Sequence, residues 1–589
     1  MARSTILLIA ISLLSACAGQ TVLQQTTPLT LTEFRLAAED RIVWRTPDLP
    51  SDASGRNWVR AKILGFSDFH GSLNGRDIDG RPVGGAAVLA AYLRAEAAEV
   101  DNYAVIVHAG DMVGASPAVS ALMQDEPSIE FLNMLANENC QSDNLAAPLC
   151  NLVGTLGNHE FDEGPDELLR LLYGGRHVES DSLVEAWKGV KFPYVSANVL
   201  QAGTGETILP PYVIKEIGGV PVAFIGAVLK NTPKIVSPAG VAGLVFLDEA
   251  ASINTYVPEL IAKNVRAIVV IIHQGLRQLS FGDAAVVGQD DLQGEIINIL
   301  VALDDEIDIV ISGHKHGFTN VLVPNANGKK ILLTQAFSGG TAYADIDISL
   351  DRASGDIVEK SATIITTWAD QGPGLFPDLE IAGLVKQANI AVAPMVNRIM
   401  AVAAADILRT QNEAGESPLG NLIADSHRAA MPVDFAFTGS GAGGIRENIM
   451  QGDITWGDLF SIKPFGNQLI GMTLTGRQIV RLLNQQWGER KSANILQVSG
   501  LTYTWDQQRT GGDKIVEILD SAGIPLDAHA SYRVAVASYH AAGGDGFDVL
   551  TEGTERITGP LVLDALIDYI SAQPQPVEVH IEGRINRRN

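Results

Sequence analysis

The stretch Gly157-Asn158-His159-Glu160-Phe161-Asp162 decides how the first part of this chain is interpreted. It follows residues 152–156, a short apolar run that predicts a buried strand ending where the polar residues begin. Asn158 offers an amide oxygen to a hard cation, His159 offers an imidazole beside it, and Asp162 could hold that imidazole in one orientation. A single hexapeptide of this kind could equally be a polar loop, so its meaning depends on the rest of the sequence.

Four other apolar runs in the first part of the chain also end in polar side chains that bind metals. They cover residues 61–66, 104–109, 267–272 and 307–312. In α/β proteins, functional sites gather outside the carboxyl ends of the strands, so we expect these side chains to share one rim. Together with Asn158, the candidate ligands are Asp68, His70, Asp111, His273, His314 and His316.

This candidate ligand set offers oxygen and nitrogen donors and no thiol. Such a set suits two divalent ions of the kind of Zn, Mn or Co. Two ions about 4 Å apart can bind a nucleophilic water and a phosphoryl oxygen together. One carboxylate is expected to bridge them, and Asp111 is the choice from its central place in the series.

The length of 589 residues predicts more than one domain. Residues 58–370 alternate strand-length and helix-length segments, which predicts an α/β domain or a domain of four αββα layers with buried sheets. Residues 371–401 are expected to form a linker that is helical from Asp378 to Ala401. Residues 402–585 mix helices and strands and predict a smaller α+β domain, after which the Arg-rich end is expected to fray.

The N-terminus has the pattern of an export signal. Residues 1–17 hold a short positive start, an apolar run and a lipobox-like ending at Cys17, which predicts a lipid anchor; an ordinary cleaved signal is the alternative. Residues 18–57 are expected to form a tether and lead-in. No later stretch suggests a membrane span, so we expect an exported protein of the periplasm or cell envelope, held at the outer membrane by its lipid alone. In that compartment, Cys140 and Cys150 are expected to form a disulfide.

The formal net charge of −26 argues against nucleic acid as a partner, because a polyanion would be repelled. It does not argue against a small anionic substrate, since bound metal ions would reverse the field locally.

The motif set Asp68-x-His70, Gly110-Asp111, Gly157–Asp162, His273-x-Gly275 and Gly313-His314-x-His316 resembles the calcineurin-like metallophosphoesterases. More narrowly, the chain resembles the two-domain 5′-nucleotidases and UDP-sugar hydrolases. The resemblance implies that Asp68, His70, Asp111 and His316 hold one metal ion. It implies that Asp111, Asn158, His273 and His314 hold the other. His159 would stabilise the phosphoryl transition state, and Asp162 would orient it.

The second part of the chain carries further family-like motifs. Glu416–Asp425 resembles a helix-opening motif, and Gly443–Arg446 resembles a loop whose Arg446 binds the substrate phosphate. Two more loops resemble those that stack on a base and bind a ribose, which implies roles for Phe465, Tyr539 and Asp545. Two departures concern this part of the site. Gly441 stands where the family has Asn, and a second phosphate-binding arginine is represented at best by Arg409.

The function implied is hydrolysis of nucleoside 5′-monophosphates by hydroxide generated at the metal pair, with no covalent intermediate. The alternatives within the family are nucleotide sugars, 2′,3′-cyclic nucleotides and sulfur-linked esters. A non-catalytic binding lipoprotein is the alternative of another class. The remaining histidines match no metal motif and are expected to be structural or exposed; they are His108, His177, His427, His529, His540 and His580.

Overall fold

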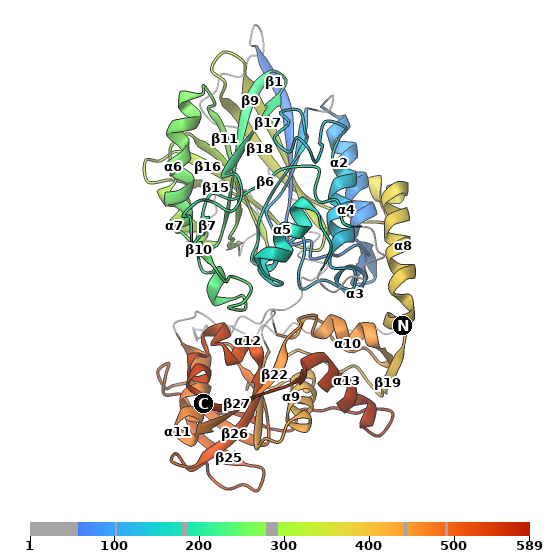
Figure 1. Cartoon of the computed structure of the whole chain (residues 1–589), viewed down its shortest axis with the longest axis vertical. Coiled ribbons are helices and arrows are strands. Elements are labelled where there is room, and N and C mark those ends of the chain that lie inside the picture. The colour runs from blue at the N-terminus through green and yellow to red at the C-terminus, as the bar shows by residue number, and fades with distance from the viewer. Residues whose placement is uncertain are drawn as a thin grey trace, which may run out of the picture.

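The structure is a computed structural model that describes residues 57–100, 103–177, 186–278, 292–440, 444–488 and 493–588. The expected signal with Cys17, the tether up to residue 56 and Gly441 lie outside these described residues. Figure 1 shows an upper domain of sheets and helices joined to a smaller lower domain.

The first sheet of the upper domain has six strands. Its middle strands are parallel, and an antiparallel pair borders them on one side. The apolar runs predicted at residues 61–66, 104–109 and 152–156 are three of its neighbours. In spatial order the strands are β18 (Ile357–Thr366), β17 (Ala342–Asp351), β1 (Trp58–Phe66), β4 (Ala104–His108), β5 (Leu152–Thr155) and β6 (Tyr194–Val195).

The second sheet also has six strands, with four parallel strands between two antiparallel edges. Its central strands are nearly uniformly apolar, as expected for parallel strands buried on both faces. In order they are β15 (Phe318–Pro324), β16 (Lys330–Ala336), β14 (Ile307–Ser312), β11 (Ala267–His273), β9 (Val220–Val228) and β8 (Tyr212–Ile217).

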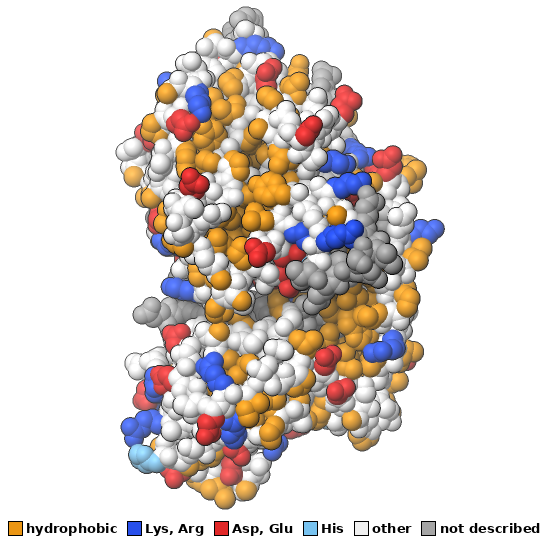
Figure 2. Space-filling model, viewed as in Figure 1, with side chains coloured by type: hydrophobic (Ala, Val, Ile, Leu, Met, Phe, Trp, Pro, Cys, Tyr) orange, Lys and Arg blue, Asp and Glu red, His pale blue; other side chains and the backbone are white. Residues whose placement is uncertain are grey.

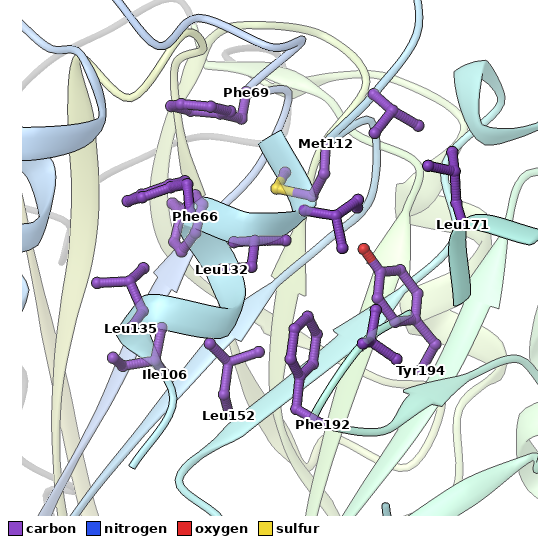
Figure 3. Close-up of a cluster of buried hydrophobic side chains, with 14 of the residues drawn as sticks. Phe66, Phe69, Ile106, Met112, Leu132, Leu135, Leu152, Leu171, Phe192 and Tyr194 are labelled. Atoms are coloured by element: carbon purple, nitrogen blue, oxygen red, sulfur yellow. The ribbon is translucent and has the colours of Figure 1, made fainter. Parts of the chain in front are cut away.

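The two sheets face each other and are covered by helices, which confirms the predicted αββα layers (Figure 1). Helices α2 (Ala86–Ala98), α4 (Glu126–Leu135) and α5 (Pro165–Tyr173) cover the first sheet, and α6 (Glu249–Ala262) and α7 (Ile296–Ala302) cover the second. Figure 3 shows side chains of the strands packing with Leu132 and Leu135 of α4 and Leu171 of α5. Burial of this apolar surface holds the strand ends in place.

The lower domain has a five-stranded sheet and a three-stranded sheet with helices packed on them. Helices α9 (Pro418–Ala430), α10 (Trp456–Ile462), α11 (Gly476–Asn484), α12 (Ser538–Ala541) and α13 (Val562–Ala572) belong to it. The larger sheet has the order β23 (Leu496–Ser499), β20 (Phe435–Gly439), β26 (Ser531–Ala537), β22 (Gln468–Thr475) and β27 (Thr554–Leu561). The smaller sheet has the order β25 (Ile515–Asp520), β24 (Leu501–Asp506) and β28 (Ile585–Arg588).

Helix α8 (Leu379–Val396) runs along the upper domain to the lower one (Figure 1). It ends five residues earlier than expected, because Pro394 weakens its last turn and the chain enters β19 (Ile399–Ala403), which pairs with β21 (Gly452–Thr455). By length and composition, α8 is the one described helix that could cross a membrane, which corrects the expectation of none. Its packing against α2 and α4 identifies it as a connecting helix of the folded protein.

The C-terminal residues are ordered up to Arg588, which corrects the expected frayed end. Strand β28 pairs with β24, and the Arg584 guanidinium donates to both carboxylate oxygens of Asp425 at 2.8 Å. The bidentate pair and the strand pairing hold this end on the domain. The disulfide between Cys140 and Cys150 is present, as predicted.

Candidate metal centre and substrate loops

The structure brings all seven predicted ligands to one place, at the carboxyl ends of strands from both sheets. Asp111, which follows β4, lies at the centre of the group. Its Oδ2 is 3.0 Å from His273 Nε2, which comes from the facing sheet, and 3.8 Å from His70 Nε2. Asp111 is 1% exposed and His273 is fully buried, so the charged centre is shielded from bulk water.

The other predicted ligands surround this centre on two sides. Asp68 Oδ1 lies 3.3 Å from His316 Nε2 and 4.0 Å from His273 Nε2. His314 Nδ1 lies 3.0 Å from Asn158 Oδ1. The backbone N–H of His314 donates to Asp68 Oδ1 at 2.9 Å, which links the two sides of the site.

The backbone of the site is strained in a consistent way. Several ligands adopt a positive φ that residues other than glycine rarely adopt, and such conformations gather at functional sites. Gly157 allows a close approach, since a Cβ at that position would lie 2.1 Å from Asp111 Oδ1. The ligands with positive φ are Asp68, His70, Asp111, His314 and His316.

The donor atoms suit divalent cations. Three overlapping groups each place their ligand atoms within 4.8 Å of one another: Asp68, His70 and His316; His70, Asp111 and His159; and Asp68, Asp111 and His273. His273 Nδ1–H donates to the carbonyl oxygen of Ala109 at 2.6 Å, while its buried Nε2 makes no hydrogen bond of good geometry among the described residues. A buried nitrogen held this way and aimed at carboxylates is the arrangement of a metal-binding histidine.

The charges around the site favour the ligating forms of these groups. Burial and the positive charge of Arg446 lower the pKa of His70 well below its usual value, so its imidazole is neutral. Burial would raise the pKa of Asp111, but His273 and His159 outweigh burial and hold that pKa well below its usual value. A neutral imidazole and an ionised carboxylate are the forms that bind metal ions.

His159 lies beside the metal ligands, as expected. Its backbone N–H donates to Asp111 Oδ1 at 2.8 Å, and its Nδ1 lies 2.7 Å from Asp162 Oδ2. Burial would lower the pKa of His159, but the carboxylates of Asp162 and Asp111 outweigh burial and raise it. His159 is therefore held in one orientation and favours the protonated form.

Glu160 is a supporting residue that the sequence analysis did not single out. It is 5% exposed, and its carboxylate accepts hydrogen bonds from the backbone N–H groups of Gly157 at 2.6 Å, Asp111 at 2.9 Å and Met112 at 2.8 Å. It thereby ties the loop after β5 to the loop that carries Asp111. Its place inside the hexapeptide, beside a ligand and a glycine, is the signal that could have identified it.

The second domain delivers Phe465 and Arg446 to the metal centre. The Phe465 ring stacks on His159 with centroids 6.2 Å apart and planes 19° apart. The Arg446 guanidinium lies 6.0 Å from the centre of the Phe465 ring. Burial lowers the pKa of Arg446, and the charges of Asp111 and Asp162 act against that effect, which places its cation within their reach.

Arg409 supports the loop of Arg446 from behind. Its Nη1 donates to the carbonyl oxygen of Ile445 at 3.0 Å, and its backbone N–H donates to Asn448 Oδ1 at 2.9 Å. The guanidinium is thus partly engaged by the backbone next to Arg446.

Tyr539 and Asp545 are joined to the Phe465 loop. Asn467 Oδ1 accepts from Ser538 Oγ at 2.9 Å and from the backbone N–H of Tyr539 at 3.2 Å. The backbone N–H of Asp545 donates to the Tyr539 hydroxyl at 3.1 Å. The segment that carries Asp545, η7 (Gly544–Gly546), packs against η2 (Thr232–Lys234) of the first domain.

Comparison with known proteins gives the same two-part division. Residues 61–318 match the calcineurin-like phosphoesterase family, and residues 392–552 match the 5′-nucleotidase C-terminal domain. The chain is 36% identical over 568 residues to Endonuclease YhcR of Bacillus subtilis, covering 94% of this chain and 43% of that protein. It is 34% identical over 554 residues to Cell wall protein Lmo0130 of Listeria monocytogenes, covering 87% of this chain and 67% of that protein.

A solved structure with the same fold is that of a 5′-nucleotidase precursor from Thermus thermophilus. It matches with a TM-score of 0.71 and 27% sequence identity, over 90% of this chain and 99% of that chain. The donor set described above fits the divalent ions that such a phosphoesterase domain requires. The chain therefore belongs to the two-domain 5′-nucleotidase family and is a metal-dependent phosphoric ester hydrolase.

Proposed function

We propose that this protein removes the phosphate from nucleoside 5′-monophosphates, using two divalent ions of the kind of Zn, Mn or Co. The observation that carries the proposal is the place of His159. It contacts Asp111 of the ligand set on one side and the Phe465 ring of the second domain on the other. If the substrate phosphate lay at the candidate metal ligands, the Phe465 ring would lie close enough to stack on the base of the same nucleotide.

Asp68, His70, Asp111 and His316 would hold one ion, and Asp111, Asn158, His273 and His314 would hold the other. Bound ions of this kind lower the pKa of a water and neutralise phosphoryl oxygens. The chain's own residues do the remaining work. Arg446 would bind the phosphate oxygens with its planar guanidinium, and His159, held by Asp162, would donate a proton to the leaving oxygen.

The nucleoside would be held by the second domain. Phe465 and Tyr539 offer aromatic faces to a base, and stacking on such a face contributes roughly 1–3 kcal/mol. Asp545 would accept hydrogen bonds from the ribose hydroxyls, and Arg409 would keep the Arg446 loop in place. Residues 58–370, 371–401 and 402–585 would then act as metal domain, linker and substrate domain.

The main alternative is a phosphodiester substrate, and it is favoured by a specific observation. YhcR, a similar protein over most of this chain, is named an endonuclease. The net charge of −26 weakens the attraction to a polyanion, and Figure 2 shows charged side chains of both signs scattered over one face. Nucleotide sugars and 2′,3′-cyclic nucleotides are the smaller substrates of this alternative, and sulfur-linked esters are a separate alternative within the same family.

We also propose that the protein is exported and held to the outer membrane by a lipid on Cys17. The lipobox-like ending of residues 1–17 supports this, and the similar protein Lmo0130 is named a cell wall protein. The non-catalytic binding lipoprotein is disfavoured, because the ligand set is complete and its atoms converge.

A substrate panel tests the proposal. AMP, UDP-glucose, 2′,3′-cyclic AMP and a short DNA oligonucleotide would be compared at equal concentration with defined Mn²⁺, Co²⁺ or Zn²⁺. We expect AMP to have the highest kcat/KM, with activity lost in chelator and restored by added metal. A higher kcat/KM for the oligonucleotide or for a small diester would contradict the monoesterase assignment.

A further inference from the structure

Asp125 stands at the N-terminal cap of α4, but its side chain does not cap that helix. An aspartate at this position usually accepts a hydrogen bond from a backbone N–H of the first helical turn. The Asp125 side chain makes no such bond with α4, and its Oδ2 accepts instead from the backbone N–H of Gly114 at 2.9 Å, eleven residues earlier in the chain. The carboxylate therefore supports the loop that follows Asp111 rather than the helix that it precedes.

Gly114 is the backbone link between Asp125 and the metal centre. Its carbonyl oxygen accepts a hydrogen bond from His70 Nδ1–H at 2.9 Å. Gly114 also lies against the proposed proton donor, since a Cβ at this position would be 2.6 Å from the carbonyl oxygen of His159 and 2.9 Å from Asp162 Oδ2. Its φ of 76° favours glycine as well. The placement of this one residue thus affects two parts of the site.

The hydrogen bond from His70 to Gly114 selects the ring nitrogen that can bind a metal ion. With its proton on Nδ1, the imidazole presents the lone pair of Nε2, which lies 3.8 Å from Asp111 Oδ2 and 3.2 Å from His316 Nε2. A metal-binding histidine commonly donates its other N–H to a carbonyl oxygen, and this contact sets the tautomer and the orientation of the ring. The carbonyl oxygen of Gly114 has that position for His70.

The surroundings of Asp125 hold its carboxylate in a conformation that costs stability. Asp125 has a φ of 56°, a left-handed value that is unfavourable for residues other than glycine and gathers at functional sites. Its backbone N–H donates to the carbonyl oxygen of Ser120 at 3.1 Å. Its Oδ1 is buried and makes no hydrogen bond of good geometry among the described residues, which is costly for a carboxylate. A role in stability alone does not explain this side chain.

We propose that Asp125 is a positioning residue of the metal centre. By holding the N–H of Gly114, it places the carbonyl oxygen that orients His70. This role rests on the proposed assignment of His70 to one ion, together with Asp68, Asp111 and His316. Among the described residues, neither Asp125 nor Gly114 forms a hydrogen bond with the residues that complete the other proposed ion site, which are Asn158, His273 and His314.

Two substitutions separate the carboxylate of Asp125 from its backbone. Glycine adopts a φ of 56° without strain and is tolerated at a helix cap, so Asp125→Gly removes the acceptor at little cost to the fold. Asparagine also tolerates a positive φ, and in Asp125→Asn its amide oxygen can still accept from the N–H of Gly114. Calorimetric titration of Mn²⁺ into the metal-free protein would measure the affinity of each ion site without relying on turnover.

The expected result is a selective loss of metal affinity. Asp125→Gly should weaken one of the two Mn²⁺ sites roughly 10- to 100-fold and leave the other unchanged, the usual effect of removing a group that orients a ligand. Asp125→Asn should keep that affinity within about threefold of the wild type, because a neutral acceptor is weaker than a carboxylate. If Asp125→Gly does not fold, Asp125→Ser, whose hydroxyl is shorter, should weaken the same site by a smaller factor.

Ser128→Ala is the matched control. Ser128 is a fully buried residue of α4, and its Oγ donates to the carbonyl oxygen of Met112, in the same loop as Gly114, at 2.8 Å. When that hydroxyl is removed, the Met112 carbonyl oxygen keeps the backbone N–H of Gly71 as a donor. This replacement removes a comparable bond between α4 and the loop without touching Gly114, so both Mn²⁺ affinities should stay unchanged.

Several outcomes would overturn the role of Asp125. They are an unchanged Mn²⁺ affinity in Asp125→Gly, equal weakening of both sites, a loss in Asp125→Asn as large as in Asp125→Gly, and the same selective loss in Ser128→Ala. A wild type that binds fewer than two Mn²⁺ ions would refute the two-ion proposal and, with it, this role. A wild type that binds two ions but does not hydrolyse AMP would refute the nucleotidase proposal alone, since the titration does not depend on the substrate.

Discussion

The metal centre and the substrate loops are built in different ways. Each candidate metal ligand lies at the end of a strand of the packed sheets or in the loop that follows it, and the central strands are buried on both faces. The candidate substrate residues lie on loops of a second domain, and side-chain hydrogen bonds such as those of Asn467 join them. The first arrangement fixes chemistry in a rigid frame, and the second leaves specificity to loops and to the placement of one domain on another.

The contacts between the domains decide how the two regions meet. Helix α10 packs against α8 and against α3 (Ala118–Ala121), and η7 packs against η2. These contacts bring Phe465 over His159, while the ligands themselves need no help from the second domain. Damage to the first region should therefore abolish catalysis on every substrate, and damage to the second should be selective.

The largest effect is expected for Asp111→Asn. Loss of the central carboxylate should reduce kcat by at least about a thousandfold on every substrate and should lower the bound metal content. Metal analysis and turnover of AMP and p-nitrophenyl phosphate would measure this. Asp79→Asn is the control, because Asp79 has a similar φ of 51° on an exposed turn. Full activity of Asp111→Asn would contradict the role of Asp111 as the central metal ligand.

A somewhat smaller effect is expected for His159→Ala. His159 lies beside the ligands without being one of the seven, so kcat should fall by roughly a hundredfold while the metal content stays unchanged. Single-turnover rates together with metal analysis would separate the two quantities. If His159→Ala lost bound metal in parallel with activity, His159 would itself be a metal ligand.

Selectivity by substrate distinguishes the second region. Phe465→Ala should raise KM for AMP roughly 5- to 100-fold, because one stacking face is lost, and should leave p-nitrophenyl phosphate nearly unchanged. Arg446→Ala should raise KM for both, since both carry a phosphate. If Phe465→Ala impaired both substrates equally, Phe465 would belong to the metal region instead.

The smallest effect is expected on stability, for Glu160→Gln. An amide keeps one acceptor oxygen, so at least one of the three backbone N–H groups bound by Glu160 loses its partner. The free energy of unfolding should fall by about 1–3 kcal/mol. Urea unfolding of the metal-free protein would measure it. Glu163→Gln, at an exposed position nearby, should change it little.

Much of the fold of the first domain could be predicted, because its strands are local apolar runs. The strand at Ile307–Ser312 has the predicted bounds. Strands β15 to β18 were not foreseen, and polar residues interrupt the apolar runs of β15, β17 and β18. The linker helix was predicted too long, because the pairing of β19 with β21 is a long-range contact.

The candidate site divides in the same manner. The seven candidate ligands could be selected from residue types at strand ends, and the hexapeptide contained His159 and Asp162. The role of Glu160 could not be predicted from the sequence, because its three hydrogen-bond donors lie on two loops that only the packed sheets bring together.

The sequence by itself determined which side chains can bind metal and that strands deliver them, because both depend on residues a few positions apart. Only the tertiary structure decided that the ligands come from two different sheets, that several adopt a left-handed backbone, and that Phe465 lies over His159. These features depend on contacts between residues far apart in the chain, whose energies exist only once the sheets and the two domains have packed.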